Sequence, residues 1–194
     1  MSTTGRRAGS RILALVVIAT VVAAALVAWQ EHDRIRRALG LRPPFPTVDT
    51  TALTPTRRRI IEVLRAEYDD PQPGEYYAEG ITEPWCADFV STTMRRAGVP
   101  LTNPNSGTWR IPGVATLTDY YRSTGRFRGP QYLPKPGDVA LYQSDSKWGQ
   151  HTNIVVVVDG GRVTTVGGNE PGGIGVQGFD HATERGVVGY GRPR

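Results

Sequence analysis

The sequence predicts an α+β fold, in which helices come first along the chain and an antiparallel sheet follows. Between residues 54 and 124, apolar residues recur at the three- and four-residue spacing of buried helix faces. After Pro134 the pattern changes to short β-branched runs bounded by glycine, which is typical of strands. A long apolar run near the N-terminus predicts one transmembrane helix before the folded part.

This apolar run covers residues 12–29 and contains no charged residue. It is close to the roughly 20 residues that a helix needs to cross a bilayer. Three arginines precede it, so residues 1–11 are expected to stay in the cytoplasm and the rest of the chain to be exported. A signal peptide cleaved after Ala25 is the alternative, but the apolar run continues to Trp29, which favours an uncleaved anchor.

Residues 30–50 are predicted to form a juxtamembrane linker. Three of the four residues from Pro43 to Pro46 are proline, which cannot stay helical and forms a stiff spacer. The domain boundary is therefore placed near residue 50, and the catalytic domain is predicted to span residues 51–194.

The net charge of +5 does not indicate a nucleic-acid partner. The first 50 residues hold seven arginines and three acidic residues, whereas the remainder holds 16 basic and 15 acidic residues. The basic excess therefore flanks the predicted membrane helix, and the domain lacks the basic surface that binds a phosphate backbone. The membrane is the partner that the N-terminal helix predicts.

Two helices are expected in the first half of the domain. Thr54 and Pro55 supply a cap and a first-turn proline for a helix that should end near Asp70. Pro84 disfavours helix in the residue before it, and apolar residues then recur at helical spacing until Gly98. The second helix therefore begins at or near Cys86.

Cys86 is the only cysteine in the chain and cannot form an intramolecular disulfide. At a helix N-terminus, unpaired backbone N–H groups and the helix dipole stabilise a thiolate, which is the form that attacks a carbonyl. We therefore interpret Cys86 as a nucleophile. The alternative is a small buried hydrophobic residue.

A long loop punctuated by proline and glycine covers residues 98–113 and leads into a further helix near residues 112–124. Trp85, which precedes the cysteine, and Trp109, in this loop, are predicted to line a substrate groove. For Trp109 the alternative that it covers the core is equally open.

The second half of the domain is predicted to form a sheet. Strands are expected at residues 137–142, 151–159 and 162–166, followed by two short strands. A turn around Gly160 joins the second and third of these. If its loop has three residues, His151 lies opposite Asn169; if it has two, His151 lies opposite Glu170.

These residues supply the parts of a thiol acyl-transfer site. A nucleophilic cysteine needs a base to take its proton and a third group to fix the imidazole tautomer. Cys86, His151 and either Asn169 or Glu170 fulfil these roles, in the order found in papain-like enzymes.

The sequence resembles the CHAP family, the cysteine- and histidine-dependent amidohydrolase/peptidase domains of bacterial cell-wall enzymes, over roughly residues 55 to 194. Five short segments in order carry the resemblance: residues 85–90, 135–140, 151–156, 165–169 and 187–190. It implies a papain-like fold and attack of Cys86 on an amide or peptide carbonyl in peptidoglycan. His151 would be general base and then acid, and Asn169 the orienting residue. Many members carry a glutamate two positions before that asparagine; here the position is Gly167, so Glu170 is the substitute to consider.

Other polar residues carry less weight. Asp88 is interpreted as a surface charge in the first turn of its helix. No cofactor is expected, and the three histidines and one cysteine match no zinc-ligand spacing.

The sequence therefore predicts a membrane-anchored cysteine hydrolase of peptidoglycan on the outer side of a bacterial cell membrane, or a secreted one if the N-terminal segment is removed. It would be either an N-acetylmuramoyl-L-alanine amidase or a peptidoglycan endopeptidase. The alternatives are a non-catalytic wall-binding module, and a thiol protease or acyltransferase that acts on exported proteins.

Overall fold

The computed structural model describes residues 43–194, and its compact unit runs from Pro44 to Arg194. The helices are α2 (Pro55–Asp69), α3 (Gly74–Tyr77), α4 (Cys86–Arg96) and α5 (Val114–Ser123). The strands are β1 (Phe127–Arg128), β2 (Val139–Tyr142), β3 (His151–Asp159), β4 (Arg162–Glu170), β5 (Gly173–Asp180) and β6 (Val187–Gly191). The predicted order, helices first and strands after, is confirmed.

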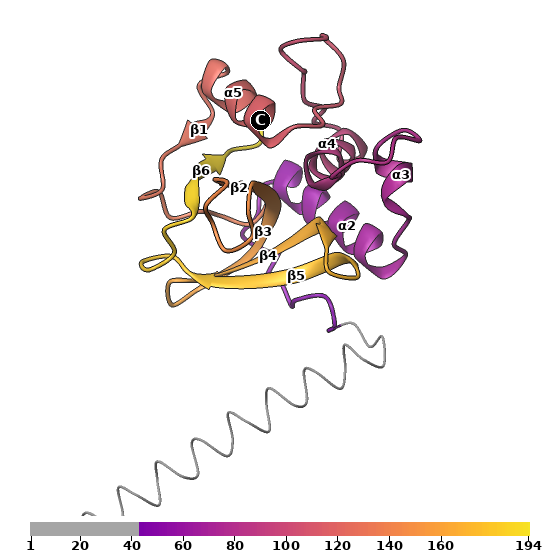
Figure 1. Cartoon of the computed structure of the whole chain (residues 1–194). Helices are drawn as coiled ribbons and strands as arrows, with labels where there is room; N and C mark the ends of the chain where they lie inside the picture. Colours follow the sequence, from indigo (N-terminus) through magenta and orange to yellow (C-terminus); the bar gives the residue numbers. More distant parts are fainter. Residues whose placement is uncertain (1–42) are drawn as a thin grey trace, which may run out of the picture. The chain divides into compact units, whose positions relative to one another are not determined.

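The strands form one sheet in the order β1-β6-β2-β3-β4-β5, and all paired neighbours are antiparallel. Helix α4 packs on the central strands β3 and β4, and α2 packs on α4 (Figure 1). The main core includes Leu64, Phe89 and Ile154. A smaller cluster that contains Ala140 and Val155 covers the opposite face, since successive strand residues alternate sides.

Two helix starts agree with the sequence signals. The hydroxyl of Thr54 accepts a hydrogen bond from the backbone N–H of Arg57 at 3.3 Å, and Pro55 follows in the first turn of α2. Helix α4 begins at Cys86, and its end is marked by Gly98 at φ +81°. The sulfur therefore lies at a helix N-terminus, as predicted.

The β3–β4 hairpin has the shorter of the two loops considered. Asp159 pairs with Arg162, so the loop consists of Gly160 and Gly161 alone. Both glycines have positive φ, which a two-residue hairpin loop with a type I′ turn requires.

The folded unit begins earlier than the predicted boundary near residue 50. Phe45 is only 8% exposed, and its ring meets that of Tyr68 edge-on at 5.6 Å. Residues 44–50, which the sequence analysis assigns to a linker, therefore belong to the compact unit. A single aromatic residue among three prolines gave no periodic signal for this packing.

The predicted membrane anchor, residues 12–29, and the cytoplasmic segment, residues 1–11, lie outside the described residues. Within residues 43–194, no helix combines the length and the apolar character needed to cross a bilayer.

Candidate active site

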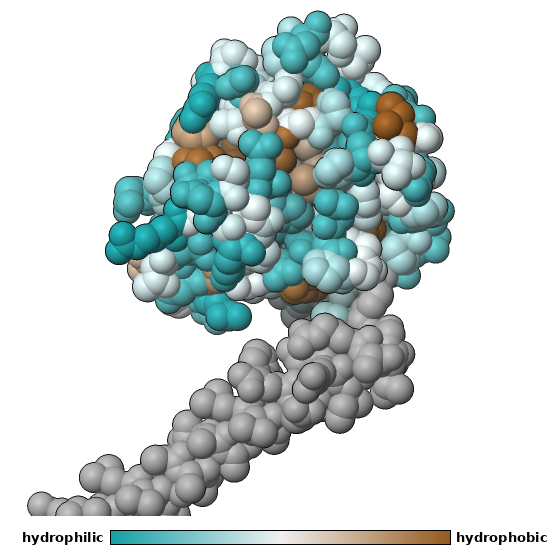
Figure 2. Space-filling view, in the orientation of Figure 1, coloured by the Kyte–Doolittle hydropathy of each residue, from teal (hydrophilic) through white to brown (hydrophobic). Residues whose placement is uncertain are grey.

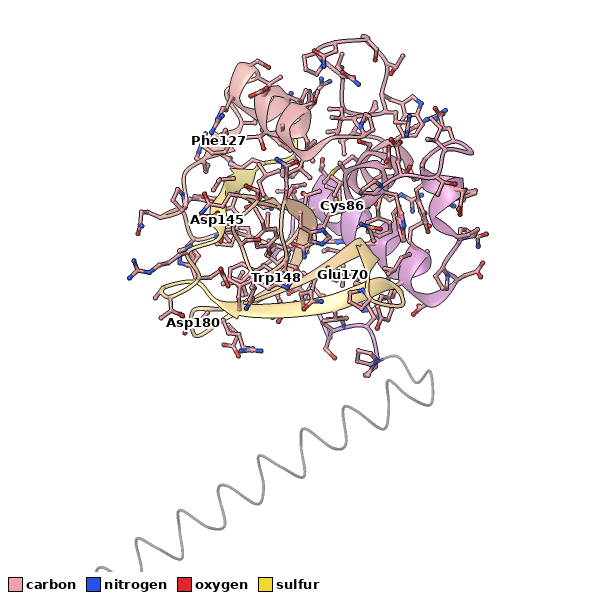
Figure 3. All side chains as sticks on the ribbon, in the orientation of Figure 1. Cys86, Phe127, Asp145, Trp148, Glu170 and Asp180 are labelled. Atoms are coloured by element: carbon pink, nitrogen blue, oxygen red, sulfur yellow. The ribbon has the colours of Figure 1, made fainter. Side chains whose placement is uncertain are left out.

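Cys86 is the first residue of α4 and is 4% exposed. Trp85, the residue that caps the helix, makes no capping hydrogen bond through its side chain. The thiol therefore lies where first-turn N–H groups stabilise negative charge. Figure 3 shows Cys86 at the start of α4 and Glu170 at the end of β4, near each other in this view.

His151, the first residue of β3, lies between these two side chains. Its Nε2 is 2.9 Å from Oε1 of Glu170, and its ring also hydrogen-bonds with Cys86. Because Nε2 is engaged by the carboxylate, Nδ1 is the nitrogen available to the thiol. His151 is 5% exposed and Glu170 is 8% exposed, so the pair is largely shielded from water.

The environment of His151 favours its protonated form. Burial opposes the charge, but the hydrogen bonds with Cys86 and Glu170 and their negative charges outweigh it and raise the pKa of His151 from 6.5 to about 9. The imidazole is therefore protonated at neutral pH. An imidazolium next to a thiol stabilises the thiolate.

Two β-bulges bring Glu170 rather than Asn169 to the imidazole. Val155 pairs with Thr165 and Val157 with Thr164, so β3 carries one extra residue, which alone would place His151 opposite Asn169. A second irregularity follows in β4, between Gly167 and Glu170, where the register against β5 shifts by one. This second shift offsets the shift in β3, so Glu170 rather than Asn169 comes to lie next to His151.

The assignment of Asn169 as the orienting residue is therefore corrected. Asn169 lies in the β4 bulge with φ +58° and an exposed side chain, whereas Glu170 contacts the histidine. Glu170 also supplies a carboxylate near position 167, where many CHAP domains carry a glutamate and this chain has glycine. A Cβ on Gly167 would stand 3.3 Å from Oε1 of Glu170, so the Glu170 carboxylate occupies space above Gly167.

Glu170 has a second partner that the sequence does not predict. Its Oε2 accepts a hydrogen bond from Nε2 of Gln177, on β5, at 2.8 Å. Both carboxylate oxygens are thus held, one by His151 and one by Gln177. The sequence carried no signal for this contact, because it depends on the register of a third strand.

Trp85 is held rigidly beside the nucleophile. Its indole stacks on the ring of Tyr77 at 5.1 Å with an interplanar angle of 7°. Side chains at Gly74 or Gly168 would collide with it, because a Cβ there would stand 2.4 Å or 2.3 Å from the indole. The backbone therefore approaches the indole closely at two places, near the five-membered ring at Gly74 and near the six-membered ring at Gly168.

A pocket of about 160 Å³ opens next to Trp85. Glu75, Glu83 and Asn169 also line it. Trp85 thus lines a pocket next to the residue that begins α4, and its role in a substrate groove stays a prediction.

Trp109 does not line that pocket. The Arg95 guanidinium lies over the Trp109 ring at 4.4 Å. Arg95 is in the last turn of α4, nine residues beyond Cys86 and therefore about 13 Å along the helix axis. The assignment of Trp109 to the substrate groove therefore stays a prediction.

Asp88 is not the surface residue that its position in the first turn suggested. It is fully buried, and its Oδ1 lies 2.7 Å from Nε of Arg110. Arg110 also contacts Glu83, so one guanidinium bridges the segment before the nucleophile and the helix after it. Burial raises the pKa of Asp88 to about 6, although Arg110 opposes the rise and Glu83 adds to it.

No group of three or more histidine, cysteine, aspartate or glutamate side chains within residues 43–194 is placed to hold a metal ion.

Comparisons with known proteins show which family the domain resembles. The CHAP domain model matches residues 76–169, the segment that contains Cys86 and His151. Two similar solved structures are the crystal structure of Ly7917 and the crystal structure of Ly7917 with the hydrolyzing product of MDP. They are 16% and 17% identical, with TM-scores of 0.36 and 0.35, and each match covers 69% of this chain. The chain spans about half the length of these structures, 51% and 52%. No curated protein matches the chain. The chain is therefore similar to the CHAP domain family over residues 76–169, a little under half of its length.

Proposed function

We propose that this chain is a cysteine hydrolase that cleaves an amide or peptide bond in peptidoglycan. The contact of His151 with both Cys86 and Glu170, inside a CHAP domain, is the observation that carries the proposal. A thiol, a base and an orienting carboxylate in contact are the set that thiol acyl transfer requires.

In the first half of the reaction, the Cys86 thiolate attacks the scissile carbonyl carbon. The backbone N–H of Cys86, at the N-terminus of α4, donates a hydrogen bond to the developing oxyanion. The His151 imidazolium gives its proton to the leaving nitrogen, the C–N bond breaks, and an amine and a thioester remain.

In the second half, neutral His151 takes a proton from a water molecule, whose oxygen attacks the thioester. The C–S bond breaks, and a carboxylic acid leaves. The thiolate and the imidazolium are then restored, so each cycle consumes one water molecule. Through its contact with Nε2, Glu170 fixes the tautomer of His151 and stabilises the imidazolium.

We further propose that the domain is anchored on the outer side of the bacterial cell membrane. The uncharged run at residues 12–29 and the three arginines before it support this orientation. It would place the domain next to its polymeric substrate.

The test is incubation of the full chain, in a mild detergent, with purified peptidoglycan. Soluble fragments are followed by mass spectrometry. Wild type is expected to release fragments with a new amino group and a new carboxyl group, and C86A to release none. The proposal fails if wild type releases nothing or if C86A releases as much.

The same fragments identify the bond. A new L-alanine amino terminus with a free lactyl carboxyl group indicates an amidase, whereas a new amino group within the stem or bridge indicates an endopeptidase. A wall-binding module would sediment with peptidoglycan, with or without Cys86, and release no fragments.

A further inference from the structure

Glu170 can orient His151 only if its own side chain is fixed. A glutamate has three rotatable side-chain bonds, and a single hydrogen bond from Oε1 leaves the carboxylate free to turn about that contact. The second hydrogen bond, from Nε2 of Gln177 to Oε2 at 2.8 Å, restrains it from the β5 side. The two contacts together define the plane of the carboxylate.

The sheet is shaped to admit this side chain. Gly167 and Gly175 pair directly across β4 and β5, and neither projects a side chain. A Cβ on Gly175 would stand 2.9 Å from the Cβ of Glu170, so the glutamate lies over this glycine pair. Gln177 is two residues beyond Gly175 and therefore projects to the same face.

We propose that Gln177 is a positioning residue, which holds the Glu170 carboxylate against His151 and so maintains the imidazolium that the reaction uses. The proposal rests on the proposed function only where it concerns catalysis. The effect of Gln177 on the protonation of His151 can be measured without a substrate.

Loss of the Gln177 donor would leave Oε2 of a largely buried carboxylate without this partner. Such a carboxylate either turns toward water or takes up a proton. In both cases His151 loses negative charge at Nε2, and its pKa falls.

The other titratable groups facing the imidazole among the described residues stay in place. They are the thiol of Cys86 on α4 and the phenol of Tyr142 on β2, whose ring stacks on His151 at 6.2 Å. Burial holds the pKa of Tyr142 well above 10, so this phenol stays neutral over the range of interest. A change in the titration of His151 therefore reports on Glu170.

The test compares Q177M, which keeps the length of the side chain but has no donor, with wild type and V176A. Val176 is the neighbouring β5 residue and packs against the main core, so V176A controls for lost stability on the same strand. In the full chain, the His151 imidazole is titrated by NMR, and the pH profile of fragment release is recorded.

Q177M is expected to lower the pKa of His151 by about one unit, which is the size of a charge-assisted hydrogen bond, and to move the alkaline limb of activity by the same amount. V176A should leave both values unchanged. A folded Q177M with the wild-type His151 titration would overturn the proposal. If Q177M does not fold, Q177T provides the same comparison, because threonine favours strands and its hydroxyl is too short to reach Glu170.

The two proposals fail in distinguishable ways. If wild type releases no fragments but Q177M still shifts the His151 titration, the proposed function fails and the role of Gln177 stands. If wild type is active and the pH profile of Q177M is the same as that of wild type, only the proposed role of Gln177 is wrong.

Discussion

At the scale of single residues, the site depends on which of two adjacent side chains meets His151. Asn169 and Glu170 are neighbours in the chain, yet the side chain of Asn169 is exposed and that of Glu170 is buried. An oxygen of Glu170 lies 2.9 Å from the imidazole of His151. A carboxylate stabilises an imidazolium more than a neutral amide does, because its negative charge adds to the hydrogen bond. Glu170 is therefore expected to contribute more to turnover than Asn169.

Substitution of Glu170 should separate these roles. E170Q keeps the shape but loses the charge, and it is expected to lower kcat/KM for a peptidoglycan fragment about 100-fold. N169G removes the neighbouring side chain at a position whose φ of +58° glycine adopts without strain, and it should stay within about fivefold of wild type. A greater loss in N169G than in E170Q would reverse the assignment.

The pKa of His151 also predicts how activity and stability depend on pH. Since the folded-state value of about 9 exceeds the ordinary 6.5, the imidazolium stabilises the fold fully below about pH 6.5, and this contribution is lost as pH rises through about 9. The same deprotonation removes the proton for the leaving nitrogen, so kcat/KM should fall above about pH 9. Rates measured from pH 6 to 10 test this prediction. A fall in kcat/KM already near pH 6.5 would show that Cys86 and Glu170 do not stabilise the protonated form of His151.

At the scale of elements, the N-terminus of α4 is fixed from outside the helix. Arg110, at the end of the loop over residues 98–113, reaches Asp88 in the first turn and Glu83 before the nucleophile. The next residue, Ile111, donates its backbone N–H to Oγ of Ser91 at 3.1 Å. The loop is thus attached to the helix that carries Cys86 at two successive positions.

R110A is expected to destabilise the domain by about 3 kcal/mol at pH 8, because it leaves the fully buried Asp88 carboxylate without its counter-charge. The cost should shrink at pH 5, below the Asp88 pKa of about 6, since a protonated carboxyl needs no cation. Denaturant unfolding at the two pH values measures both.

Two further variants test the cause. D88N/R110A should be more stable at pH 8 than R110A alone, because the uncompensated charge is gone. R95A removes an exposed arginine that covers Trp109 and should cost less than about 1 kcal/mol. If R110A costs no more than R95A, the Asp88 ion pair does not hold the loop.

These elements also show what the sequence could and could not predict. Helix α4 was predictable because Pro84 and Gly98 mark its limits within one segment. The choice of Glu170 was not, because it depends on two bulges whose positions are set by packing between strands. Nor was the Asp88–Arg110 pair, since its partners are 22 residues apart and first-turn acidic residues are usually solvated.

At the scale of the whole molecule, the described domain covers its apolar residues well. Figure 2 shows hydrophobic residues as small scattered patches on a mostly hydrophilic face. Among residues 43–194, the large hydrophobic residues that remain exposed are Tyr76, Ile81 and Leu133. Tyr76 and Ile81 belong to the same segment, between α2 and α4, that contributes to the pocket beside Trp85.

The limit of the folded unit gives the last prediction. Phe45 packs edge-on against Tyr68, and the guanidinium of Arg65 lies 4.4 Å from the centre of its ring, so α2 depends on a residue that precedes the predicted domain. F45A should lower the free energy of unfolding by about 2 to 3 kcal/mol, less than a central phenylalanine because the site is at the edge of the core.

V48A, which shortens a partly buried side chain three residues later, is the control and should cost about 1 kcal/mol. Unfolding of the two full-chain variants in denaturant provides the comparison. If F45A unfolds at the wild-type midpoint, the contact with α2 adds no stability and the folded unit begins closer to residue 51. If F45A unfolds at a much lower denaturant concentration than V48A, the folded unit begins at Pro44. A shortened domain for the cleavage assays must then include Phe45.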